Sequence, residues 1–388
     1  MANTLTFTQI ATVLNSIVSQ ATGQAAITPT DTSSFVAVAQ TGLLAGYDPL
    51  MSAISQVLSR TVFSVRPYTR KFKGLEADAA HYGNHVRKLQ IVDGEWQEDD
   101  RVKLVDGQAI DQYTVRKPKA LQTNFYGENV VDDHVTIFKD QLDVAFSGPE
   151  EFAQFISMVM QNMSDRIEQK HETLARGAVA NFMAGKSKCD ATNVIHLVTQ
   201  YNTDTGSSLD STTVYAPANF ENFAKWLMGY LKTVSDLMSE RSAKFHMNFT
   251  GKTIMRHTPL EKQKIYLYTK DLNNIDARVL SGAFHDDYLK VADHEAVNFW
   301  QAIDSPLEIK ATPAYNNADG TIATPVATTL DNVFGVIMDE EAVGYTTVNN
   351  WSAPTPFNAR GGYSNMFWHF TDRYWNDFTE NAVVLIMD

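Results

Sequence analysis

The chain has 388 residues, of which 44% are hydrophobic and 20% charged, a balance typical of a folded protein with a sizeable core. Its net charge of −13 argues against nucleic-acid binding driven by overall charge, which needs clustered Lys and Arg. The single cysteine, Cys189, excludes an internal disulfide and any multi-cysteine metal site. Because no signal peptide and no bilayer-spanning apolar run is present, we expect a protein that stays in the cytoplasm.

Residues 1–75 are interpreted as an N-terminal arm rather than as a core. Apolar residues at helical spacing near Phe7–Val18 predict one short helix, and those between Tyr47 and Leu58 predict a second. Residues 62–68 read as an extended segment. Because such an arm cannot bury its apolar surface locally, we expect it to pack on something else.

The next stretch, between His81 and Tyr126, carries alternating residues and the turn dipeptides Asp93-Gly94 and Asp106-Gly107, which predict a long, charged β-hairpin. Long isolated hairpins are marginally stable in water, so we expect support from outside the subunit. Basic residues flank the hairpin. We interpret them as a solvated face or as contacts to an acidic neighbouring subunit rather than as a phosphate site: Arg66, Arg70, Lys71, Lys73, Arg116, Lys117 and Lys119.

A long amphipathic helix is predicted from Ser147 to Gly185. Its apolar residues fall three or four apart, or seven where His171 intervenes, and form one stripe: Phe152, Ile156, Val159, Met163, Ile167, Leu174, Ala178 and Phe182. Pro149 suits the first helical position, and Gly185 suits the end. At 1.5 Å per residue the helix is roughly 50 Å long. A single interrupted stripe favours a sheet of the same chain over a coiled-coil mate as its partner.

Helices and strands then mix without a regular βαβ order, which predicts an α+β fold. Residues 316–330 read as an exposed loop. Two final strands, Met366–Trp375 and Ala382–Met387, are expected to form the sheet partner of the long helix. The other expected elements are helices at 219–244 and from Pro259 through Leu267, and strands at Val194–Val198, Val297–Ile303, Leu307–Ala311 and Asn332–Met338.

No catalytic, cofactor-binding or metal-binding residue is predicted. Gly251-Lys252-Thr253 lacks the earlier glycine of a phosphate-binding loop, and the pair His81 and His85 lacks a third metal ligand. His171 is interpreted as a packed histidine of the long helix. One cluster keeps a metal or acid–base site open as an alternative: His285, Asp286, Asp287, Asp293, His294 and Glu295.

The order of arm, hairpin, long helix, α+β domain and returning strands resembles that of the major capsid proteins of tailed bacteriophages, which have the Hong Kong 97-type fold. Three segments look like phage capsid sequences: YDPLMSAISQVLSRTVFSVRPY, FGVIMDEEAVGYT and DFTENAVVLIMD. The resemblance implies five parts. These are an N-terminal arm (1–75), an extended E-loop hairpin (76–130), a P-domain with its spine helix (131–186), an A-domain (187–345) and returning P-domain strands (346–388).

The resemblance also implies a structural protein, not an enzyme, that assembles with copies of itself as hexamers and pentamers. The product would be the icosahedral head shell around the double-stranded DNA of a tailed phage, assembled in the host cytoplasm. Scaffolding and portal proteins, and in some members decoration proteins, are the implied partners. Non-specific contact with packaged DNA is implied as well, with no membrane and no cofactor. The alternatives are an encapsulin-like compartment shell and a metal-dependent enzyme that uses His285 to Glu295.

Overall fold

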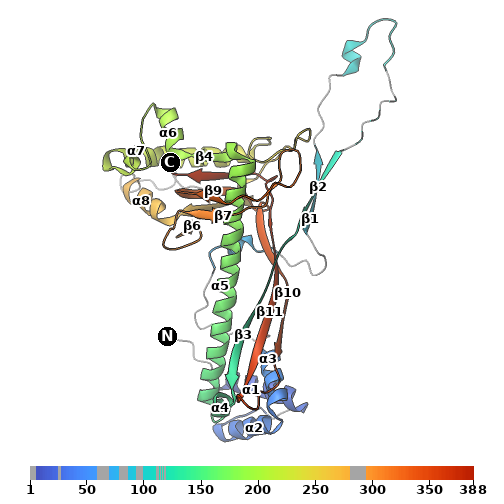
Figure 1. The fold of residues 1–388 in the computed structure, drawn as a ribbon, viewed down its shortest axis with the longest axis vertical. Coiled ribbons are helices and arrows are strands. Elements are labelled where there is room, and N and C mark those ends of the chain that lie inside the picture. Colours follow the sequence, from blue (N-terminus) through green and yellow to red (C-terminus); the bar gives the residue numbers. More distant parts are fainter. Residues whose placement is uncertain are drawn as a thin grey trace.

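The computed structural model describes residues 6–24, 28–58, 70–77, 86–92, 99–110, 113, 115, 117, 119–279 and 294–388. The subunit is elongated (Figure 1). Helix α5 (Pro149–Cys189) follows the long axis, with small helices at one end and a layer of helices and sheet at the other. A hairpin of β1 (Val86–Val92) and β2 (Lys119–Phe125) projects from the second end. None of the helices in this described part has the length and hydrophobicity that a membrane span requires.

Helix α5 has 41 residues and begins at Pro149, as the sequence predicts. Its predicted end at Gly185 is wrong, because the helix continues to Cys189. Gly185 is needed for packing instead: a Cβ atom there would overlap the ring of Phe378. The apolar stripe faces sheets of the same chain, so the predicted type of partner is confirmed.

The first half of α5 packs on a three-stranded antiparallel sheet with the order β10-β11-β3. Its strands are β3 (Gly127–Phe138), β10 (Val343–Pro354) and β11 (Tyr363–Asn376). Alternate residues of β11, namely Met366, Trp368 and Phe370, point into the shared core.

The N-terminal helices complete this core. They are α1 (Phe7–Thr22), α2 (Thr32–Leu44), α3 (Tyr47–Leu58) and, before α5, α4 (Lys139–Ala145). Helices α1 and α3 are confirmed, whereas α2 is absent from the sequence prediction. Leu14, Phe35 and Ile54 are completely buried against α5 and the sheet. The expectation that the arm packs on something else is confirmed for these helices, and what they pack on is α5 and the sheet of their own chain.

The second half of α5 covers one face of a five-stranded sheet with the order β4-β12-β9-β5-β6. The strands are β4 (Val194–His196), β5 (Gln263–Tyr268), β6 (His294–Val297), β9 (Val333–Asp339) and β12 (Ala382–Ile386). Helices α6 (Leu197–Thr205), α7 (Pro217–Ser239) and α8 (Thr269–Val279) cover the other face. Along β12 the two faces alternate, so that Val384 meets the α5 side and Leu385 meets the α7 side.

Two expectations for this region are wrong. Leu267 lies in the strand β5 rather than in a helix, because β5 is buried on both faces and its apolar run lacks the alternation of a half-exposed strand. The strand expected at Val297–Ile303 ends at Val297. The two final strands do pack on α5, as expected, but in different sheets, since β11 pairs with β10 and β3 while β12 pairs with β9 and β4.

The remaining elements are short. Strands β7 (Ile309–Ala311) and β8 (Thr328–Leu330) form a two-stranded antiparallel sheet. Short 3₁₀ helices lie at η1 (Lys73–Leu75), η2 (Asp100–Lys103), η3 (Ala191–Asn193), η4 (Thr213–Tyr215) and η5 (Leu260–Lys262).

Candidate assembly surfaces

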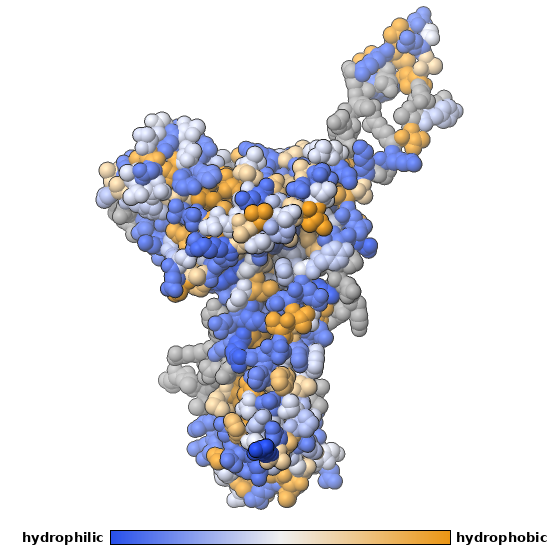
Figure 2. Space-filling view, in the orientation of Figure 1, coloured by the Kyte–Doolittle hydropathy of each residue, from blue (hydrophilic) through white to orange (hydrophobic). Residues whose placement is uncertain are grey.

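The projecting hairpin carries large apolar side chains on its surface. Strands β1 and β2 pair antiparallel from Val86 opposite Phe125 to Val92 opposite Lys119, and the described residues beyond them form an open loop. Among the described residues of the hairpin, seven aliphatic side chains are between 42% and 79% exposed, and Figure 2 shows apolar residues along this projection. We call them the apolar hairpin surface: Leu89, Ile91, Val102, Leu104, Val105, Ile110 and Val115. A concentration of exposed apolar side chains on one projection marks a surface for a protein partner.

Polar side chains attach the hairpin to its own subunit. Lys88 of β1 lies 2.8 Å from Glu341 and 3.3 Å from Asp377, and it also forms an ion pair with Glu380. Gln90 donates a hydrogen bond to the Thr379 hydroxyl at 3.0 Å. Burial lowers the pKa of Lys88, but its attraction to Asp377 and Glu380 outweighs burial and raises that pKa above the ordinary value. Lys88 is therefore fully charged at neutral pH.

A second polar network joins α5 to segment 70–77 and to the three-stranded sheet. Arg70 donates to Nδ1 of His171 at 2.6 Å, and Nε2 of His171 lies 3.2 Å from the Thr347 hydroxyl. Thr347 donates in turn to Asp372 at 2.8 Å, and Asp372 also pairs with Lys170 at 2.5 Å. Since a guanidinium can only donate, His171 accepts at Nδ1 and carries its proton on Nε2.

This network tests two of the interpretations made from the sequence, those of His171 and Arg70. His171 is buried and bonded on both ring nitrogens, so it is a packed histidine of α5. Arg70 is 7% exposed and pairs with Glu76 and His171 of its own chain, so its expected role on a solvated face or at a neighbouring subunit is wrong. The sequence carries no local signal for this pairing, because Arg70 and His171 are 101 residues apart.

The other candidate residues do not converge on a site in the described structure. His81, His85, His285, Asp286, Asp287 and Asp293 lie outside the described residues. His294 and Glu295 lie on the edge strand β6, and burial raises the pKa of Glu295. Within the described ranges, no group of three His, Cys, Asp or Glu side chains is placed to hold a metal ion.

Two further sequence features have structural explanations. Gly251 has a φ of +72° in a tight turn in which Phe249 bridges to Lys252, so this glycine serves the turn. Cys189 ends α5, and burial raises the pKa of its thiol to about 12. A thiol with that pKa is protonated at neutral pH and is therefore a poor nucleophile.

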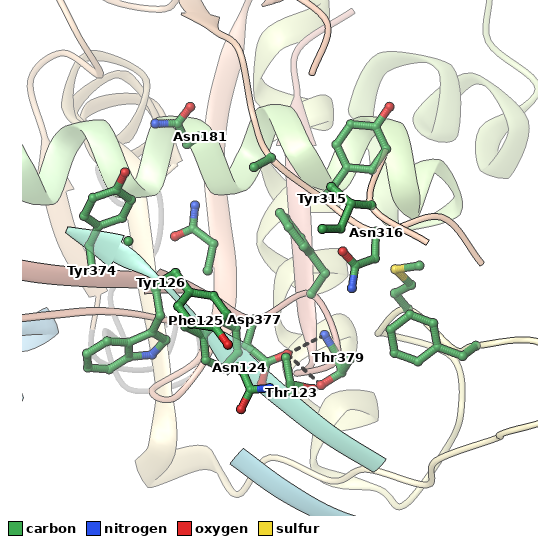
Figure 3. Close-up of a pocket in the computed structure, with 18 of the residues that line it drawn as sticks. Thr123, Asn124, Phe125, Tyr126, Asn181, Tyr315, Asn316, Tyr374, Asp377 and Thr379 are labelled. Atoms are coloured by element: carbon green, nitrogen blue, oxygen red, sulfur yellow. Dashed lines mark hydrogen bonds between the residues drawn. The ribbon is translucent and has the colours of Figure 1, made fainter. Parts of the chain in front are cut away.

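Two open grooves run along the subunit where the hairpin, α5 and the sheets meet. The first, of about 460 Å³, is lined by β2, α5, the loop at Tyr315 and Asn316, and the end of β11 (Figure 3). The second, of about 690 Å³, lies between β3 and α5 and shares Asn181 and Tyr374 with the first. Figure 3 shows amide, hydroxyl and aromatic side chains around the first groove, together with Asp377, which accepts hydrogen bonds from Thr379.

The model of the protein family described as Phi29-like phage major capsid protein matches residues 14–386 of this chain. The chain belongs to this family. As a phage major capsid protein it is a structural protein of the virion shell, and the resemblance seen in the sequence is confirmed. A sequence search among curated proteins finds no match.

Solved structures support the fold of this capsid protein. A chain from the capsid structure of Staphylococcus phage Andhra matches with a TM-score of 0.55 and 10% identity, and the match covers 84% of this chain and 87% of that chain. A chain from the structure of the head fiber and inner core protein gp22 of native bacteriophage P68 matches with the same four values. The α+β architecture is therefore one found in tailed-phage capsid structures, consistent with the Hong Kong 97-type fold.

Proposed function

We propose that this capsid protein assembles as hexamers and pentamers, and that the apolar hairpin surface of each copy is buried on a neighbouring copy. The observation that carries the proposal is the exposure of Val102, Leu104 and Val105 on a projection that reaches beyond the core of its own subunit. Burial of apolar area is the main favourable term in protein association. In capsid terms, the projection is the E-loop, α5 is the spine helix of a P-domain, and the five-stranded sheet is the core of an A-domain.

The same proposal includes the partners and the setting of the shell. Scaffolding and portal proteins would direct assembly in the host cytoplasm, decoration proteins are a further option, and the protein would have no enzymatic activity. Contact with packaged DNA would be non-specific. At −13 per copy the subunit repels a polyanion overall, which suits a container that a motor fills rather than a protein that wraps DNA.

The test replaces the exposed side chains without disturbing the core. The triple variant Val102→Ser, Leu104→Ser and Val105→Ser removes apolar area that is already solvent-exposed in the isolated subunit. We expect a subunit with unchanged circular dichroism and unchanged thermal unfolding that forms few closed particles in negative-stain electron microscopy. Gln108→Ser, in the same loop, is the matched control and should assemble normally. Normal shells from the triple variant would refute the role of the hairpin.

The contents of the particles separate a phage shell from an encapsulin-like compartment. The protein should be expressed together with the genes that neighbour it and imaged by electron microscopy. Closed particles that contain double-stranded DNA after packaging support the phage shell, which the family match favours. Particles that contain a cargo enzyme instead would favour the compartment.

A further inference from the structure

The residues of strand β1 alternate in exposure: Lys88, Gln90 and Val92 are covered, whereas Arg87, Leu89 and Ile91 are exposed. Lys88 and Gln90 contact the body of the subunit, whereas Leu89 and Ile91 are 66% and 77% exposed. A strand that packs permanently on a protein core usually presents mainly apolar residues to it. Two of the three covered residues of β1 are polar, so much of its attachment to the subunit is ionic and polar.

The contact is a cluster of five charged groups. Three carboxylates, of Glu341, Asp377 and Glu380, surround Lys88, and Arg256 lies 2.9 Å from Glu380. The side chains of Asp377 and Glu380 are 1% and 5% exposed. Three acids thus face two paired cations, and removing Lys88 would leave Arg256 as the cation paired with Glu380. Buried carboxylates that lose a cationic partner are strongly destabilised.

The space beneath β1 is not closely packed. A cavity of about 610 Å³ lies between the start of β1, residues 74–77 and the turn between β9 and β10, and Lys88 and Asp377 line it. Oδ2 of Asp377 has no hydrogen-bond partner, although Lys88 Nζ lies 3.3 Å away. The ion pair between Lys88 and Asp377 therefore lacks the alignment of a hydrogen bond. The open cavity beside it leaves space into which β1 can move.

The segment that receives β1 is itself attached to α5. Phe378, between Asp377 and Thr379, stacks on Phe182 of α5 with ring centroids 5.3 Å apart. The carbonyl of Phe378 also accepts a hydrogen bond from the backbone of Met247 at 2.9 Å. The turn at residues 377–380 thus connects β1 to α5, in addition to the pairing of β1 with β2, which leads into β3.

We propose that Lys88 and its three carboxylates form a releasable latch that sets the direction of the hairpin. With the latch closed, β1 lies against residues 377–380; with the latch open, the hairpin pivots at its base while its own strand pairing stays intact. The inference builds on the proposed role of the hairpin in assembly, because a hairpin that changes direction would reach a different place on a neighbouring copy.

Distances between spin labels on unassembled subunits test the latch directly. Labels are attached at Gln122→Cys on β2 and Lys232→Cys on α7, two exposed positions, in a Cys189→Ser background. The otherwise unchanged protein should give one narrow distance distribution. Lys88→Met, which keeps the aliphatic stem and removes the charge, should lose that narrow distribution. Lys88→Arg, which keeps the positive charge, should keep it.

A second variant keeps the test decisive if Lys88→Met does not fold. Glu341→Gln with Glu380→Gln removes two of the three carboxyl groups with little change of shape, and it should also lose the narrow distribution. A narrow distribution in the folded Lys88 variant, or in the double variant when the first does not fold, would overturn the latch. Because the measurement uses unassembled subunits, its result is independent of whether the hairpin tip mediates assembly.

Discussion

Phe182 of α5 and Phe378 of the turn after β11 stack face to face, with ring centroids 5.3 Å apart and planes 3° from parallel. Gly185 lies next to this pair on α5, and a Cβ atom there would overlap the Phe378 ring. Gly177 lies on the same helix with open space at the corresponding position. The two glycines therefore have different roles, and a pair of alanine substitutions separates them.

Gly185→Ala should destabilise the subunit, because the methyl group displaces Phe378 from its stack with Phe182. We expect a loss of about 1–3 kcal/mol in the free energy of unfolding, the usual cost of overpacking a core. Gly177→Ala should instead stabilise by about 0.5–1 kcal/mol, since alanine is the better helix former. Urea unfolding of unassembled subunits measures both. Equal effects of the two substitutions would contradict the role assigned to Gly185.

Lys186→Met should destabilise the subunit because it leaves buried acceptors unpaired. Lys186 is completely buried, and its Nζ lies 2.7 Å from Asp190 and donates to the Phe245 carbonyl at 3.1 Å. Burial lowers the pKa of Lys186, although Asp190 acts against this. Breaking such a pair from one side costs about 3 kcal/mol. Lys186→Met combined with Asp190→Asn should recover part of the loss, which a double-mutant cycle by urea unfolding would show.

Asp271 should make stability depend on pH. It is 3% exposed, and burial raises its pKa to about 6, although the Tyr215 hydroxyl donates to it at 3.3 Å. The folded state therefore binds this proton more tightly than the unfolded chain, so the stabilising contribution is complete at low pH and is lost as pH rises from about 4 to about 6. Asp271→Asn should stabilise the subunit by about 2 kcal/mol near pH 7 and have little effect near pH 4.

Asp210 supplies the control of opposite sign for that experiment. It is exposed, and hydrogen bonds from the backbone and side chain of Thr213 and the backbone of Thr212 lower its pKa. Asp210→Asn should slightly destabilise the subunit at neutral pH, and this effect should shrink on acidification. Thermal unfolding of both variants across the pH range gives the comparison. The pH interpretation fails if the two substitutions change stability in the same direction at every pH.

Cys189 should react slowly with thiol reagents in the folded subunit. Burial raises the pKa of its thiol to about 12, so the thiolate fraction is very small at neutral pH. Ellman's reagent should modify the native protein slowly and the urea-unfolded protein quickly. Rapid modification of the native protein at pH 7 would show that this end of α5 opens readily.

The sequence predicts the long helix well because its signal is local. The stripe from Phe152 to Phe182 and Pro149 at the first position need no distant information. The prediction of the helix end fails because Gly185 serves a contact with Phe378, which lies nearly two hundred positions further along the chain. A glycine at a helix end and a glycine under an aromatic ring look the same in a sequence.

Strand pairing and the attachment of the hairpin depend on contacts that the sequence does not display. A short polar turn joins Met366–Trp375 to Ala382–Met387, and nothing local in the sequence shows that this turn carries the chain from one sheet to another. Lys88 gives no local sign of its partners, since Glu380 is 292 residues away. The exposed apolar side chains of the hairpin were foreseeable from the lack of a local core, whereas the burial of Arg70 was not.

The two halves of α5 lie in different cores, and each core is completed by a strand made late in synthesis. Leu14 of α1 shares a core with Trp368 of β11, and Ala178 of α5 shares a core with Val384 of β12. Neither core can be completed before these strands have been synthesised. Contacts of such long sequence separation form slowly. A nascent chain on the ribosome would thus hold its helices without their sheets until β11 and β12 emerge. Polysomes would carry chains that are not yet competent to join a shell, and assembly would begin only with finished subunits.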